Sequence, residues 1–141
     1  MVLATIMQCV LLGTTVTPPN AADSWNDFFE HIQDMDLPDG EQSSWGPAEQ
    51  AKYEELLPLI RQAREYSQME HCDWGLDYSE GMGLLLPHLG PMRQASMLIR
   101  FSIQADVTAG NNTSAIDGMN SILGLSQQSS SDNTVIGALV S

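Results

Sequence analysis

Basic residues are scarce in this chain. Five Lys and Arg stand against 18 Asp and Glu, which gives a formal net charge of −13. A protein of that sign repels nucleic-acid phosphates and anionic lipid headgroups, so nucleic-acid binding and electrostatic membrane binding are disfavoured. A basic protein or a divalent cation is compatible with the charge, although acidity more often serves solubility alone.

Cysteine and catalytic signatures are scarce as well. Cys9 and Cys72 are too few for a disulfide scaffold, and a single buried cysteine usually acts as a small apolar residue. The sequence contains no G-x-S-x-G, no phosphate-binding glycine loop and no C-x-x-C, H-x-x-x-H or H-E-x-x-H pair. We therefore predict no catalytic residues and no cofactor, and we favour a non-enzymatic protein.

Composition and helical signals predict one all-α domain. A chain of 141 residues suits a single domain, and 43% hydrophobic with 16% charged residues is close to globular averages. Asn20 is a good cap for a first helix over residues 21–33. The apolar residues of that helix share one face: Trp25, Phe28, Phe29 and Ile32. We expect an irregular array of helical hairpins with four to six helices.

A second helix is predicted from Pro47 to about Gln68. Tyr53, Leu56 and Ile60 recur at helical spacing on its inner side. Pro58 interrupts this pattern, because proline removes one backbone hydrogen bond and crowds the preceding turn. We expect a kink or a break there.

The helix predicted over residues 91–109 lies in the densest apolar run of the chain and is predicted to be the centre of the fold. Pro87 and Pro91 suit a helix start because proline lacks the N–H that the first turn leaves unpaired. Gly110 suits the left-handed residue that follows a last turn. The apolar residues form two adjacent strips: Met92, Ala95, Leu98, Ile99, Phe101, Ile103 and Ala105. A helix that is apolar over so much of its circumference should be buried by its neighbours.

A helical hairpin is predicted over residues 92–125. Its second half has the spacing of the turn and second helix of a tetratricopeptide hairpin, through Gly110, Ala115, Ile116, Met119, Ile122, Leu123 and Leu125. The resemblance covers one unit, and it implies protein–protein interaction through a helical surface. Residues 126–131, SQQSSS, have the composition of a short polar connection.

The two ends of the chain are apolar. Residues 1–16 contain no charge and have the length of a signal-peptide core, and Pro18 and Pro19 follow as a spacer. We expect residues 1–20 to be a signal-like or anchoring segment of an exported protein, the alternative being a buried first helix or strand. Residues 21–141 form the helical domain, and the apolar residues 135–140 lead us to expect that the chain is the front part of a longer protein.

The segment from 70 to 88 gathers the residue types that chemistry would need. His71, Asp73, Asp77 and His88 are potential metal ligands if the fold brings them together. Their spacing does not match a zinc motif. The alternative interpretation is structural, with Trp74 and Leu76 packed on the core and the two aspartates bonded to backbone amides in tight turns.

The order of features also resembles a group of uncharacterised exported helical proteins of bacteria. The shared features are the uncharged leader, PPNAA, an aromatic helix, CDWGLDY, LLLPHLGPMR and an A-x(4)-G hairpin. We expect a non-enzymatic, extracytoplasmic helical module that binds another protein, of open oligomeric state, with no membrane contact beyond an N-terminal anchor. The alternatives are a metal-dependent hydrolase-like site at residues 70–88, or a fragment of a larger enzyme.

Overall fold

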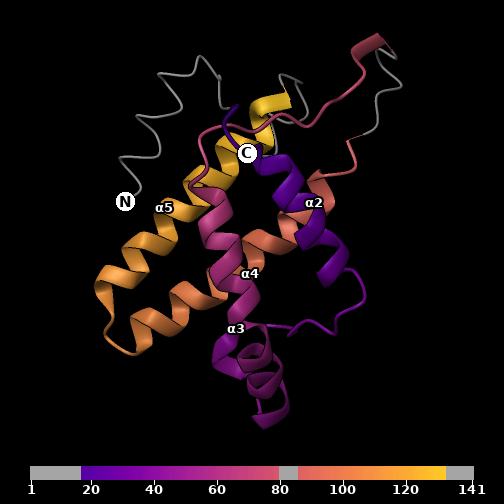
Figure 1. Cartoon of the computed structure of the whole chain (residues 1–141). Coiled ribbons are helices and arrows are strands. Elements are labelled where there is room, and N and C mark those ends of the chain that lie inside the picture. The colour runs from indigo at the N-terminus through magenta and orange to yellow at the C-terminus, as the bar shows by residue number, and fades with distance from the viewer. Residues whose placement is uncertain (1–16, 80–85, 133–141) are drawn as a thin grey trace, which may run out of the picture.

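The computed structural model describes residues 17–79 and 86–132. Over these ranges the chain forms four α-helices and no strand (Figure 1): α2 (Ala21–Ile32), α3 (Pro47–Ser67), α4 (Leu89–Thr108) and α5 (Asn112–Ser129). Short 3-10 turns lie at Gln42–Ser44 and Ser130–Asp132. The predicted all-α class and irregular helical array are confirmed. The predictions for residues 1–16 and 135–140 fall outside the described residues.

Helix α2 follows its sequence pattern closely. The Asn20 side chain caps it by accepting a hydrogen bond from the Ala22 amide at 3.2 Å. Trp25, Phe28 and Ile32 point into the core and are no more than 2% exposed. The predicted aromatic stripe is therefore the face by which α2 packs.

Helix α3 runs through Pro58 without interruption, so of the kink or break expected there, the break does not occur. Proline cannot donate the hydrogen bond that the Glu54 carbonyl would accept four residues earlier. Both Glu54 and Pro58 lie on the exposed side of the helix, where water can bond to that carbonyl instead. The opposite side buries Tyr53, Leu56 and Ile60 as predicted.

Helix α4 is the buried central helix that the sequence predicted. It begins two residues earlier than expected and ends at Thr108, and Gly110 then adopts a positive φ of 78°. Its apolar side is covered by α3 and α5. The buried residues of α4 are Met92, Ala95, Leu98, Ile99, Phe101 and Ser102.

Helix α5 completes the hairpin but packs through small and polar residues. It continues to Ser129, so the polar connection predicted over residues 126–131 is wrong. A Cβ on Gly118 would lie 2.5 Å from Ile103 Cγ1, and one on Gly124 would overlap the backbone carbonyl oxygen of Ser67. Glycine at these two positions therefore lets α5 lie against both α3 and α4.

The hairpin pattern located α5 without identifying its buried face. Ala115 and Leu125 are buried. The larger residues of the pattern point outward, with Ile116, Met119 and Leu123 all more than half exposed. Of the helices in the described residues, none is long and apolar enough to span a membrane.

Candidate functional site

The two candidate aspartates of the 70–88 segment are used in tight turns. Asp73 Oδ1 accepts a hydrogen bond from the Gly75 amide at 2.9 Å, and Asp77 Oδ1 accepts one from the Ser79 amide at 3.0 Å. Hydrogen bonding from Ser79 lowers the pKa of Asp77 below its ordinary value. The structural interpretation of these carboxylates is confirmed, because their oxygens accept from backbone amides as it predicts.

The two candidate histidines are placed in different environments. His71 is exposed, and its backbone carbonyl accepts a hydrogen bond from the Ala21 amide at 2.8 Å. His88 is only 3% exposed, and its ring stacks on Trp74 with centroids 4.3 Å apart. Within residues 17–79 and 86–132, no three His, Cys, Asp or Glu side chains form a group that could hold a metal ion. The fold thus does not assemble His71, Asp73, Asp77 and His88 into one ligand set.

Trp74 belongs to a ladder of aromatic rings that ties the segment to α2. The ring centroids are 5.9 Å apart between Trp25 and Phe29, and 6.2 Å apart between Phe29 and Trp74. His88 also stacks on Trp74, with the ring planes 13° apart. A cleft of about 560 Å³ opens beside the ladder. Phe29, Trp74 and His88 line this cleft, so the aromatic contacts form part of its wall.

Gln128 is the polar centre of the core. Its Oε1 accepts from Trp25 Nε1 at 2.7 Å, and its Nε2 donates to the carbonyls of Tyr66 at 2.8 Å and Met69 at 2.9 Å. The Gln128 carbonyl accepts from Trp74 Nε1 at 2.8 Å. One residue, 5% exposed, therefore joins α2, the end of α3, the 70–79 segment and α5. Nothing in the run SQQSSS distinguishes this glutamine from its neighbour.

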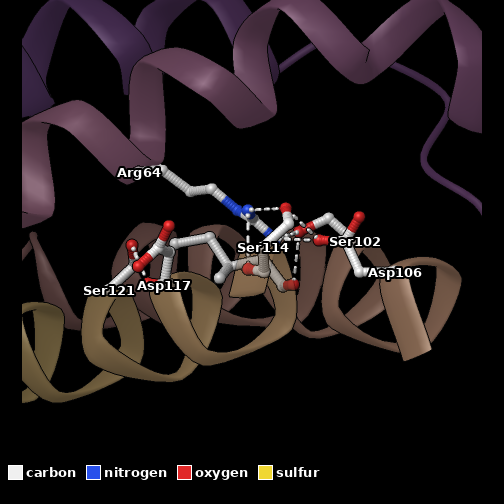
Figure 2. A network of polar contacts seen from close by, with 7 residues as sticks. Arg64, Ser102, Asp106, Ser114, Asp117 and Ser121 are labelled. Atoms are coloured by element: carbon white, nitrogen blue, oxygen red, sulfur yellow. Dashed lines mark hydrogen bonds and ion pairs between the residues drawn. The ribbon is translucent and has the colours of Figure 1, made fainter. Parts of the chain in front are cut away.

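A second polar network fixes the hairpin to α3. Figure 2 shows Arg64 reaching from α3 toward residues of α4 and α5. Its Nη2 donates to Ser102 Oγ at 2.7 Å and pairs with Asp106 Oδ2 at 3.0 Å, and its Nη1 donates to Ser114 Oγ at 3.2 Å. The Ser114 hydroxyl also donates to Asp106 at 2.6 Å. The Ser102 hydroxyl donates in turn to the Ile99 carbonyl at 2.7 Å, so every partner of Arg64 makes a further hydrogen bond, which favours a structural role.

Cys72 has the environment of an unreactive thiol. It is half-buried beside α5, and burial raises the pKa of its thiol above the ordinary value. A raised pKa keeps the thiol protonated at neutral pH, and the thiolate is the nucleophilic form. Cys72 therefore behaves as the small apolar residue that the sequence suggested.

The outer face of α5 carries three of the exposed large apolar residues of the described chain. Ile116 is 57% exposed, Met119 52% and Leu123 63%, and their i, i+3, i+7 spacing places them in one line along the helix. We refer to these three residues as the α5 stripe. Sequence reasoning named all three as part of the hairpin. Their exposure depends on Gly118 and Gly124 turning the opposite face inward.

No protein-family model, curated protein or solved structure matches this chain. The candidate site consequently rests on geometry. Two of the polar clusters, around Gln128 and Arg64, are bonded into the core. The α5 stripe is the feature that the fold leaves open to solvent.

Proposed function

We propose that this chain is a non-enzymatic helical module that binds another protein chain through the outer face of α5. The observation that carries the proposal is the exposure of the α5 stripe. Single exposed apolar residues are ordinary on a protein surface, whereas contiguous exposed apolar patches mark interaction sites. Three large apolar side chains aligned on one helix give a ridge that an apolar groove or a second helix could bury.

The composition of the face supports this proposal. Of the exposed residues of α5, only Asp117 is charged; the others are apolar or neutral polar, such as Asn120 and Gln127. Depletion of charge and enrichment of methionine distinguish the core of protein interfaces from the remaining surface. The face of α5 is depleted of charge in a chain whose formal net charge is −13, and Met119 is the one methionine on it.

The test uses two substitutions that add the same charge. Met119→Glu places a carboxylate in the centre of the stripe, and Val107→Glu places one on an exposed apolar residue of α4 outside it. Proteins retained by the full chain from its source cells are identified, and the strongest is purified and titrated against both variants. We expect Met119→Glu to weaken binding about tenfold or more while Val107→Glu leaves it unchanged. If both variants bound the purified partner equally well, the outer face of α5 would not be the binding site.

We also propose that the chain acts outside the cytoplasm, which rests on the uncharged segment 1–16. Fractionation of source cells tests this directly. A version carrying a C-terminal tag should be found in the extracytoplasmic fraction. A second version with arginines at positions 6 and 11 should stay inside, because charge in the apolar core blocks translocation. A cytoplasmic location for both versions would overturn the proposal of export.

A further inference from the structure

Charge is distributed unevenly over the exposed sides of the helices. α2 exposes Asp23, Asp27 and Glu30, and α3 exposes Glu54, Glu55 and Glu65. α5 exposes a single carboxylate, that of Asp117, and no Lys or Arg follows Arg100 in the sequence. α4 exposes two arginines, Arg93 and Arg100, and no carboxylate. α5 is therefore the least charged helical face, and three exposed large apolar residues lie on it.

This distribution bears on which partner fits. A basic partner would gain most by docking on α2 or α3, where carboxylates are dense, and it would find one carboxylate on α5. In a two-fold pair of copies each face meets itself, so pairing through α2 or α3 would set carboxylates against carboxylates, and pairing through α4 would set Arg93 and Arg100 against their own copies. A nearly neutral face avoids this repulsion. Of the helices compared, α5 is the one that has such a face.

We propose that the α5 stripe binds the α5 stripe of a second copy, with the two helices antiparallel. This inference rests on the proposed function and names the partner. An antiparallel arrangement about a two-fold axis near Met119 brings Ile116 of each chain opposite Leu123 of the other, and it brings the two Met119 side chains together at the centre. The face is then complementary to itself, as a two-fold interface requires.

The position of Asp117 distinguishes the two possible orientations. In a parallel pair the two Asp117 carboxylates would lie at the same height and repel. In the antiparallel pair Asp117 lies opposite residue 122, so the two carboxylates are separated by five residues, roughly 7.5 Å along the axis, in addition to the helix separation of about 8–10 Å. The carboxylates are then about 11–12.5 Å apart, against about 8–10 Å in the parallel pair, so their repulsion is weaker and more strongly screened in the antiparallel arrangement.

Sedimentation of the full chain over a wide dilution series tests this association. We expect a reversible monomer–dimer equilibrium. Met119→Glu and Met119→Lys should both weaken it about tenfold or more, because each buries a charge at the centre of the interface. Val107→Glu is the matched control for added negative charge, and it should leave the equilibrium unchanged. Weakening by Met119→Lys matters most, since lysine reduces the net charge and would strengthen association if long-range repulsion alone governed it.

Disulfide trapping tests the orientation. In a Cys9→Ser/Cys72→Ser background, Met119→Cys should form a covalent dimer under mild oxidation, because the two-fold axis brings residue 119 close to its own copy. Asn112→Cys, at the N-terminal end of α5, should not form a covalent dimer in the antiparallel arrangement. In a parallel pair both cysteine variants would form one. Efficient trapping at residue 112 therefore overturns the antiparallel arrangement.

Two other outcomes would overturn self-association. A Met119→Cys chain that stays monomeric at all concentrations, with its introduced thiol freely reactive toward maleimide, has no second copy on the stripe. A monomer in which that introduced thiol reacts slowly has its stripe covered by its own chain. If Met119→Glu still abolishes binding of a purified different protein, the proposed function stands and only the identity of the partner is wrong.

Discussion

Helices α2 and α5 are packed by opposite rules. α2 turns Trp25, Phe28 and Ile32 inward and leaves its carboxylates in water. α5 turns Gly118, Ser121 and Gln128 inward and leaves the α5 stripe in water. Hydrophobic burial holds α2, whereas close backbone approach and buried hydrogen bonds hold α5. A helix with apolar residues at helical spacing can therefore pack through its opposite side, where that side carries glycines and hydrogen-bonding residues.

The largest expected effect lies on the α2 side. Trp25→Ala should cost about 3–5 kcal/mol of unfolding free energy, because it removes the largest fully buried side chain and the donor to Gln128. Urea unfolding followed by circular dichroism measures it. Trp25→Phe, which keeps a ring and loses the N–H, should cost less. Equal loss in both variants would mean that the hydrogen bond to Gln128, rather than apolar burial, holds α2 in place.

The next largest effect is expected where Arg64 of α3 contacts the helical hairpin of α4 and α5. Arg64→Met should cost about 2 kcal/mol, below the value for a fully buried pair, because the Arg64 and Asp106 side chains keep about a fifth of their exposure. Arg61→Met, exposed on the same helix, is the control and should stay within about 0.5 kcal/mol. A double variant Arg64→Met/Asp106→Leu should recover part of the loss. Similar stability of Arg64→Met and Arg61→Met would contradict the role assigned to the network.

The smallest effect appears only in alkaline solution. It concerns Tyr53 of α3, a helix that packs by apolar burial as α2 does. Burial, followed by the charge of Asp106, raises the pKa of Tyr53, so the folded state favours the neutral phenol. The contribution of the buried neutral phenol to the free energy of unfolding is complete below the ordinary pKa of about 10. It is lost as pH rises through the higher pKa of the folded state. The stability of the native chain should therefore fall relative to Tyr53→Phe above about pH 10. If the urea midpoints of the native chain and of Tyr53→Phe changed in parallel above about pH 10, Tyr53 would not lie in an apolar site.

The parts of the fold that could be predicted are those where apolar spacing and capping agree. Asn20 with the aromatic stripe of α2, and Gly110 at the end of α4, are examples in which one residue type has one low-energy use. The unbroken path of α3 could not be predicted, since it depends on whether the carbonyl facing Pro58 meets water or protein.

The candidate site was predicted in part. The sequence indicated the hairpin and named the residues of the α5 stripe, and spacing alone could not say which face is buried. That choice is made by Arg64, 50 residues away from Ser114, and by Gln128, 103 residues away from Trp25. A residue pair at such separation leaves no local pattern, so the polar partners that orient α5 became visible only in three dimensions.

Adjacent residues of α5 provide the most direct test of this account. Leu123→Ala removes a large apolar side chain that is 63% exposed, and Gly124→Ala adds one methyl group against the Ser67 carbonyl. In dilute solution, where association contributes little, we predict that Leu123→Ala changes the unfolding free energy by less than about 0.5 kcal/mol and that Gly124→Ala lowers it by about 1–3 kcal/mol. A loss above about 2 kcal/mol for Leu123→Ala, together with a neutral or stabilising Gly124→Ala, would contradict the orientation of α5.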